Sequence, residues 1–452
     1  MSTSRATTTL SPARTLAVLA TAQFLVVLTT SIVNVALPQV RDGLRLSPAG
    51  LSWVVNAYVL LFGALLLLGG RLGDVYGLRR VFLTGLVLFT VSTLIAGLAG
   101  DPATLIGARA VQGVGAALLA PTALALVLRL FPAGPARGTA LGVWGAVSGA
   151  GGAAGVLLGG LLSGPFGWRA VFFATLPVSL ALFPAAWWWV AADRPRGGTV
   201  DVPGALSVTA GLVATIYGVS AWGTTGSRVS LAAGALLLGA FLVRQRRAAD
   251  PLVPPRILGT GQVGLANVLM SLVGAVWVGL FFFLPLYQQR TLGYSPVRAG
   301  VTQLPLAVSI TALSWAAPRL DRVLPRRVVL VAGLAALTAG LAWLSRAPAG
   351  GTFLADLLGP SLLTGAGLGV AFVELTTLSS AGVPAGDSGL AGGLVNATRQ
   401  VGGACGLAAL TAVAAGGHYG AAFTAAAAIA AVTTLLALLV GSTLPATPAA
   451  QR

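Results

Sequence analysis

The sequence predicts an all-α polytopic membrane protein with two six-helix bundles plus two inserted helices, making fourteen transmembrane helices. Of its 452 residues, 56% are hydrophobic and only 8% are charged, whereas about a quarter of the residues in a soluble globular protein are charged. Long apolar runs alternate with short polar segments, and the arginines gather at the ends of the runs. This composition excludes a soluble globular protein.

Each predicted helix is an apolar run close to the roughly 20 residues that a membrane span needs. The runs lie near residues 16–38, 51–69, 81–99, 103–128, 138–163, 169–191, 202–222, 229–243, 261–286, 299–317, 327–344, 352–378, 388–414 and 419–441. The eighth run, 229–243, would be only about 22 Å long at 1.5 Å per residue. It is too short to span unless it begins earlier or the bilayer thins.

Arginine placement predicts the orientation of the helices. Every basic residue is Arg, and most fall in the segments that are inside if the N-terminus is cytoplasmic, which agrees with the positive-inside bias. We therefore expect a plasma-membrane protein with both termini in the cytoplasm. The clusters at 194–196 and 244–247 can share a side only if an even number of helices separates them, which supports both the seventh and the eighth helix spanning.

Several functional classes are disfavoured by composition. The net charge of +17 forms no continuous patch, so we expect no nucleic acid partner. A single Cys405 and a single His418 leave no internal disulfide and no His cluster for a metal. We expect no cofactor and no enzyme activity, because no paired acids or activated nucleophile stand out. The expected partners are a small-molecule substrate, protons and the lipid bilayer, and we expect a monomer.

The polar segment GRLGDVYGLRR, residues 70–80, is predicted to be a short gating loop between the second and third helices. Its glycines permit a tight reversal, and an acid lies between basic residues. A charged latch is one interpretation, and a solvated loop is the other. The residues of this loop are Gly70, Asp74, Gly77, Arg79 and Arg80.

This pattern occurs a second time, as Arg319-Leu320 followed by Asp321, with Arg326 and Arg327 five and six residues after Asp321. If the seventh and eighth helices are an insertion, both loops occupy the same place in a six-helix unit. We therefore expect an N-terminal bundle at 1–192, an inserted pair at 193–256 and a C-terminal bundle at 257–452. Chance similarity of short Arg-rich loops is the alternative.

Two ionisable residues within spans are candidates for proton coupling. Arg109 would lie about 10 to 12 Å from the outer helix end, where an arginine costs about 2.5–3.5 kcal/mol. Its alternative is an arginine satisfied by backbone carbonyls. Glu374 is the only Glu and lies roughly 13 Å before Val383, a depth that suits proton uptake and release. Its alternative is a structural pair with an arginine such as Arg399.

Two further groups of residues are expected to serve packing and the substrate pathway. Small residues at every fourth position of the fifth helix permit close helix packing; they are Gly151, Gly155, Gly159 and Gly160. Polar and aromatic side chains within spans are candidates for a substrate pathway, although aromatic residues often face lipid instead. The pathway candidates are Asn34, Gln112, Trp277, Phe281 and Asn396.

These motifs together resemble the fourteen-helix drug:proton antiporter branch of the major facilitator superfamily. The 70–80 segment resembles that superfamily's loop between helices 2 and 3, and the segment around Arg109 resembles its helix 4 motif, whose arginine is associated with proton coupling. The Gly151 to Gly160 segment resembles the antiporter motif, with Val156 where that motif has proline. In helix 1, Thr29 stands where the branch usually has Asp, so that acid's role does not carry over.

The resemblance implies an exporter of lipophilic or cationic compounds, such as drugs or toxic metabolites, in exchange for protons by alternating access. The alternative is a uniporter or importer of a small organic solute on the same fold, which Thr29 and Val156 favour. A proton-flux assay during export separates the two.

Overall fold

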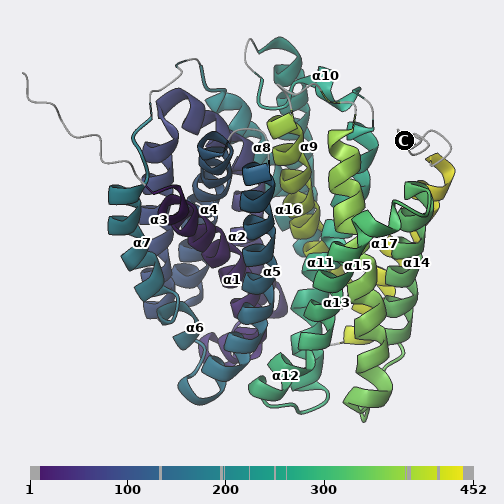
Figure 1. The fold of residues 1–452 in the computed structure, drawn as a ribbon. Helices are drawn as coiled ribbons and strands as arrows, with labels where there is room; N and C mark the ends of the chain where they lie inside the picture. The colour runs from purple at the N-terminus through teal and green to yellow at the C-terminus, as the bar shows by residue number, and fades with distance from the viewer. Residues whose placement is uncertain are drawn as a thin grey trace, which may run out of the picture.

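The computed structural model describes residues 11–131, 135–193, 197, 199–222, 224–248, 251–260, 262–381, 383, 388–414 and 418–440. Every regular element within these ranges is helical. The helices form two groups that stand side by side, α1 to α7 in purple to blue and α11 to α17 in green to yellow (Figure 1). The prediction of an all-α membrane protein is confirmed.

The first group contains seven helical segments that make six spans. They are α1 (Pro12–Leu44), α2 (Pro48–Tyr76), α3 (Leu78–Leu98), α4 (Pro102–Leu130), α5 (Pro135–Phe166), α6 (Ala170–Phe173) and α7 (Leu176–Trp189). The short α6 and the longer α7 follow one another as the sixth span. The inserted pair is α8 (Val202–Ser220) and α9 (Thr225–Arg247), followed by the short α10 (Pro255–Leu258).

The second group also makes six spans, two of them interrupted. Its segments are α11 (Val263–Arg290), α12 (Pro296–Thr302), α13 (Leu304–Leu320), α14 (Arg326–Leu344), a π-helical turn η1 (Phe353–Leu357), α15 (Leu358–Ser380), α16 (Ser388–Val413) and α17 (Tyr419–Val440). α12 and α13 share one span, and η1 and α15 share another.

Among the described residues, thirteen helices are long and apolar enough to cross a membrane. The fourteenth predicted helix, α16, is long enough at 26 residues but is less apolar, because it carries Asn396, Arg399 and Gln400. α16 packs against α2 and α11 and so has protein on both of these sides. Polar residues in a span are tolerated where neighbouring helices shield them from lipid.

The eighth helix begins earlier and ends later than the predicted 229–243, so it is long enough to span. α9 has 23 residues, about 34 Å at 1.5 Å per residue, which exceeds a hydrocarbon core of about 30 Å. Its polar ends belong to the helix: the side chain of Thr224 accepts a hydrogen bond from Ser227 N at the start, and Arg244 lies in the last turn. Capping at the start and positive charge at the end both stabilise a helix.

The predicted loop at 70–80 is wrong in its extent. α2 continues to Tyr76 and α3 begins at Leu78, so the reversal consists of Gly77 alone, with φ of +100°. That φ favours glycine because it has no Cβ. Gly70 and Gly73 instead lie in α2, where a Cβ added to Gly73 would be 2.9 Å from Cγ2 of Thr122 in α4.

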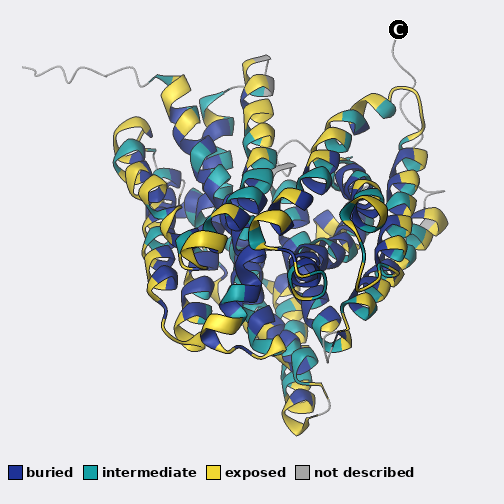
Figure 2. Cartoon of the chain, turned by 90° about the horizontal axis from the view of Figure 1, so that it is seen from below, coloured by how far each residue is buried: buried dark blue, intermediate teal, exposed yellow. Residues whose placement is uncertain are grey.

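The two halves meet along several pairs of helices, which include α1 with α11, α5 with α12 and α2 with α16. α5 packs against α12, where a Cβ on Gly160 would lie 2.5 Å from the carbonyl oxygen of Pro296. α2 packs against α16, where a Cβ on Gly63 would lie 2.6 Å from Cβ of Gln400. Figure 2 shows the buried residues mainly on the inward faces of the helices and the exposed ones mainly on the outer faces.

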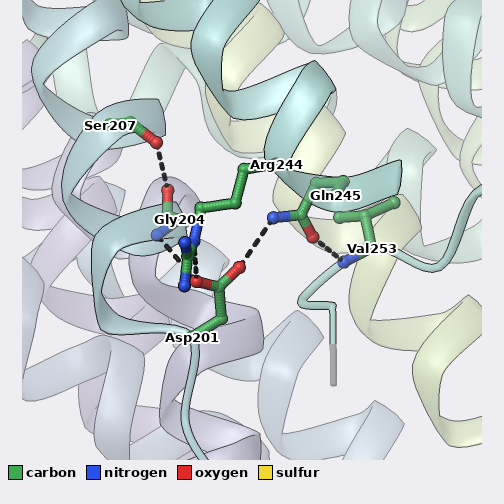
Figure 3. A network of polar contacts seen from close by, with 6 residues as sticks. All are labelled: Asp201, Gly204, Ser207, Arg244, Gln245 and Val253. Atoms are coloured by element: carbon green, nitrogen blue, oxygen red, sulfur yellow. Dashed lines mark hydrogen bonds and ion pairs between the residues drawn. The ribbon is translucent and has the colours of Figure 1, made fainter. Parts of the chain in front are cut away.

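The inserted pair α8 and α9 is joined at one end by Asp201 (Figure 3). Asp201 accepts hydrogen bonds from Gly204 N and from Gln245 Nε2, both at 2.9 Å, and it pairs with Arg244. Gln245 Oε1 in turn accepts a hydrogen bond from Val253 N at 2.9 Å. This network ties the start of α8 to the end of α9 and to the segment before α10.

The Asp201 network predicts a pH-dependent contribution to stability. Burial raises the pKa of Asp201, but the bonds from Arg244, Gly204 and Gln245 outweigh it and leave the pKa below its usual range. The stabilisation is therefore complete above the unfolded-state pKa of about 3.9 and is lost as pH falls through the lower folded-state value. We expect Asp201→Ala to lower stability by about 2 kcal/mol at neutral pH, measured as a lower unfolding temperature in detergent.

The control is Arg228→Ala, which removes a charge from an exposed residue at the other end of α9. It should unfold like the unaltered protein, and the deficit of Asp201→Ala should shrink below about pH 4. Equal unfolding temperatures for Asp201→Ala and the unaltered protein at pH 7 would contradict the role of the network.

Candidate functional site

Arg109 of α4 is 1% exposed and is held entirely by neutral groups among the described residues. Its Nε donates to the carbonyl oxygen of Val54 at 3.0 Å, and its Nη1 donates to Oε1 of Gln112 at 2.6 Å. The guanidinium lies 4.3 Å from the centre of the Tyr58 ring. Gln112 Nε2 also donates to Oγ1 of Thr93 at 2.7 Å. Arg109 thus joins α2, α3 and α4, much as the alternative interpretation expects.

Glu374 of α15 is fully buried and lies beside Arg326, the first residue of α14. Nε of Arg326 is 3.1 Å from Oε2 of Glu374, but it donates its hydrogen to Oδ2 of Asp321 at 3.0 Å. Neither carboxyl oxygen of Glu374 therefore has a hydrogen-bond partner among the described residues, and the same holds for Oδ1 of Asp321. We call these three residues the Asp321–Arg326–Glu374 cluster.

The cluster identifies the partner of Glu374. Glu374 forms the ion pair with an arginine that the alternative interpretation expected, but its partner is Arg326 and not Arg399. Arg109, the other candidate for proton coupling, lies in the first half of the chain, in α4. The sequence missed Arg326 as a partner because it is separated from Glu374 by the whole of α14, and only helix packing brings them together.

Arg326 begins the third span of the second half, and the third span of the first half begins at Leu78 in α3. There the start of the helix is bound by Asp193, which follows α7. Asp193 accepts hydrogen bonds from the backbone N–H groups of Leu78 and Arg79 at 2.8 and 3.0 Å, and from Nη1 of Arg129 at 2.8 Å. Burial raises the pKa of Asp193, but these three donors outweigh burial and lower it overall. Sequence reasoning missed Asp193; its signal was an isolated acid directly after the sixth span.

The predicted loop arginine Arg79 contacts α7. Its Nη2 donates to the carbonyl oxygen of Trp187, and its guanidinium lies 5.0 Å from the Trp187 ring. In the second half, Nη2 of Arg327 donates to the carbonyl oxygen of Leu438 in α17 at 2.9 Å. Both arginines are the second residue of the third span of their half, and both bind the end of the sixth span. Arg80 is exposed.

We call the end of the molecule that carries Arg79, Arg129, Arg244, Arg326 and Arg327 the arginine-rich end. The opposite end is where the halves are joined by α5 and α12. There Nη2 of Arg290 in α11 pairs with Asp42 of α1 and also donates to the carbonyl oxygen of Pro38 at 3.0 Å. Nε2 of Gln289 donates to the carbonyl oxygen of Val35 at 2.8 Å. The halves are thus bonded to one another at the opposite end.

The predicted packing glycines of α5 face two different helices. Added Cβ atoms on Gly151, Gly155 and Gly159 would lie within 3.0 Å of atoms of α1, whereas one on Gly160 would meet α12 of the other half. The motif thus holds α5 to α1 and lets α5 reach across to the second half. Val156, in the place of the expected proline, is buried, and its carbonyl oxygen faces Gly300 of α12.

The structure groups only some of the predicted pathway residues. The rings of Trp277 and Phe281 are 5.7 Å apart, and Trp277 also lies 6.3 Å from the ring of Phe372. Asn396 donates to the carbonyl oxygen of Gly392 in its own helix at 3.1 Å. Gln112 is committed to Arg109 in the first half.

Asn34 of α1 is also in the first half. It is buried, and its Oδ1 has no hydrogen-bond partner among the described residues. A buried acceptor without a partner is uncommon in native structures, so Asn34 stays a candidate for the substrate pathway.

Comparison of the sequence with models of known protein families identifies the family to which the chain belongs. The family model described as Major Facilitator Superfamily matches residues 19–407. The chain belongs to this superfamily. The resemblance predicted from its motifs is confirmed, and the protein is a transporter rather than an enzyme.

Similar proteins of the superfamily include antibiotic exporters. The chain is 43% identical to the cephamycin export protein CmcT of Amycolatopsis lactamdurans, over 96% of this chain and 95% of that protein. It is 42% identical to the puromycin resistance protein pur8 of Streptomyces alboniger, over 89% and 81% of the two chains.

Solved structures share the fold at low identity. A peptide transporter in complex with sulfate has a TM-score of 0.71 at 17% identity, covering 95% of this chain and 94% of its own. A D-xylose–proton symporter has a TM-score of 0.69 at 15% identity, covering 96% and 98%. Because these identities are so low, the two structures support the fold of this chain and say nothing of its substrate.

Close contact between Gly160 and α12 predicts that this residue controls closure of the opposite end. A larger side chain at Gly160 would overlap Pro296, and overpacking of this kind costs about 1–3 kcal/mol. We expect Gly160→Leu to raise the open population at this end roughly tenfold. The measurement is thiol labelling of Ala299→Cys, a position that is buried in α12, in a background that carries Cys405→Ser.

Gly152→Leu is the matched control, because a Cβ at Gly152 meets nothing within 4 Å. Labelling of Ala299→Cys should be slow with Gly152→Leu and fast with Gly160→Leu. Equal labelling rates in the two variants would show that the α5–α12 contact does not close this end.

Proposed function

We propose that this transporter exports small organic molecules, such as drugs or toxic metabolites, across the plasma membrane in exchange for protons by alternating access. The observation that carries the proposal is Glu374, a fully buried carboxylate that shares one arginine with Asp321 and accepts no hydrogen bond from a described residue. The antibiotic export and resistance functions named for the relatives support the outward direction.

In this proposal the arginine-rich end faces the cytoplasm, as the positive-inside bias favours. The predicted cytoplasmic termini lie outside the described residues. We propose a monomer with bundles at 1–192 and 257–452 and an inserted pair at 193–256. The insertion is supported by α8, which packs against both α2 and α16 beside the contact between the halves.

The proposed proton carrier is the Asp321–Arg326–Glu374 cluster. With both acids ionised, two negative charges share one guanidinium, so one carboxylate is in excess. A proton on Glu374 removes that excess and lets the carboxyl group donate a hydrogen bond. Because the cluster joins the ends of α13, α14 and α15, its charge biases how these helices pack. In alternating access the proton and the substrate influence each other only because each binds the two conformations of the transporter with different affinity.

Arg109 and Asp74 have supporting roles in the proposal. Arg109 has no acidic partner among the described residues, so it would sense proton movement through the shared packing of α2, α3 and α4. Asp74 remains the proposed latch acid of the 70–80 segment, near the Gly77 reversal. The bonds of Asp193 to the start of α3 support a latch at this place in the first half.

A uniporter or importer on the same fold is the alternative. It is favoured by Thr29, which is 1% exposed, cannot carry a proton as an Asp could, and has no hydrogen-bond partner for Oγ1 among the described residues. Proton flux that accompanies substrate movement separates this alternative from antiport.

We expect Glu374→Gln to abolish proton-driven export, because the amide keeps the size of the side chain but cannot exchange a proton. The measurement is substrate movement in proteoliposomes under an imposed pH gradient, with a loss of at least about tenfold, as general acid–base groups commonly contribute 10² or more. Substrate equilibration without a gradient should persist.

Asp356→Asn is the control, since it makes the same acid-to-amide change in η1, at the other end of the same span. It should leave gradient-driven export in place. Proton-driven export by Glu374→Gln at the normal rate would contradict the proposed role of the cluster as proton carrier.

A further inference from the structure

Arg399 lies near the middle of α16, about 17 Å along the helix from Ser388 at 1.5 Å per residue. It forms no hydrogen bond or ion pair within the described part of the chain, and its Nε is buried. Its neighbours are aromatic: the guanidinium carbon lies 5.8 Å from the ring of Trp277 and 5.6 Å from that of Phe372. A cation at this depth normally has a partner.

Arg109 shows what a satisfied arginine looks like in the same protein. It is 1% exposed, makes two hydrogen bonds and lies over a tyrosine ring. Arg399 has the aromatic contacts but none of the hydrogen bonds, and it is only half-buried. Its donors are therefore available to an acceptor that is not among the described residues.

The half-buried surface near Arg399 opens into the protein rather than toward lipid. On α11, residues 273–276 and 278–288 are all buried, and Trp277 between them is the half-buried one. A helix surrounded by protein on all sides has no lipid face, so the exposed part of Trp277 lies within the molecule. Phe372 and Arg399, which contact Trp277, are half-buried as well.

The backbone of α16 holds Arg399 firmly in place. A Cβ added to Gly274 of α11 would lie 2.1 Å from the carbonyl oxygen of Arg399, and one on Gly402 would lie 2.1 Å from that of Ser271. α11 and α16 are thus in backbone contact at Arg399 itself and again at Gly402, one turn later. A charged group on such a rigid support is preorganised for a ligand.

No acid among the described residues forms an ion pair with Arg399. Neither α11 nor α16 contains Asp or Glu. Glu374, on the same helix as Phe372, is paired with Arg326, and Asp356 accepts a hydrogen bond from Thr352 N at the start of η1. A ligand that supplies a negative charge would satisfy the guanidinium, and the adjacent rings would contact its apolar part.

We infer that Arg399 binds the oxyanion group of an exported molecule whose aromatic body packs against Trp277 and Phe372. The inference rests on the proposed export function and specifies its substrate class. It replaces the lipophilic or cationic substrates that the resemblance implied with aromatic anions, because Arg399 beside Trp277 and Phe372 has no acidic partner among the described residues.

The test compares probes that share rings and differ in charge. 8-Anilinonaphthalene-1-sulfonate carries an anion, N-phenyl-1-naphthylamine has the same rings without it, and ethidium is an aromatic cation. Apparent Kd values come from the rise in unfolding temperature of the purified protein, with no anionic lipid and no proton gradient. We expect Arg399→Gln to weaken sulfonate binding by about tenfold or more, equivalent to about 1.4 kcal/mol, and to leave amine binding unchanged.

Two further variants control the experiment. Arg399→Lys keeps the charge but loses the planar fork, so it should retain part of the sulfonate affinity. Arg298→Gln removes an exposed arginine that also lies over an aromatic ring, 3.9 Å from Tyr294, and should bind both naphthyl probes normally.

The inference is overturned if the unaltered protein prefers the amine or ethidium to the sulfonate, or binds none of the three. It is also overturned if Arg399→Gln weakens sulfonate and amine equally, because that result marks a structural role. Binding of these probes needs no proton movement. If the proposed antiport at Glu374 fails its own test, the probe affinities are therefore unaffected, and the two failures can be told apart.

Discussion

A charge inside a membrane is costly unless it is paired, and the way this chain pairs Arg109 and Glu374 organises the helices around them. Arg109 is surrounded by a carbonyl oxygen, an amide and a ring, and these contacts join α2, α3 and α4. Glu374 reaches Arg326, which joins the ends of α13, α14 and α15. These two intramembrane charges thus help to set which helices lie together, since an unpaired charge is costly in lipid.

Close backbone contacts make these charge placements possible. Without a hydrophobic force between helices in lipid, small residues allow helices to approach and gain van der Waals contact. A Cβ on Gly69 would lie 2.0 Å from the carbonyl oxygen of Ala117, and one on Gly113 would lie 2.5 Å from that of Tyr58. The second contact brings α2 and α4 together beside Arg109, so glycine packing and charge pairing support each other.

The sequence was sufficient to predict where the helices lie, but it was not sufficient to predict which charged side chains pair with one another. Apolar runs predicted the spans to within a few residues, but α9 was underestimated because its polar ends are helical, and the 70–80 segment because its glycines pack rather than turn. Arg109, Glu374 and Trp277 stood out by residue type alone. Asp193 and Arg326 did not, because their partners lie far along the chain or across a helix. Asp193, for example, binds Leu78, 115 positions away.

The two halves share a plan but differ in how completely their charges are satisfied. In the first half, Asp193 has three donors and Arg109 has two acceptors. In the second, the carboxyl oxygens of Glu374 lack hydrogen bonds and Arg399 lacks an acceptor among the described residues. A group that is already satisfied gains little from a ligand, whereas an unsatisfied one gains a full interaction. Differential binding, the requirement for coupling two ligands to one conformational change, is therefore concentrated in the second half.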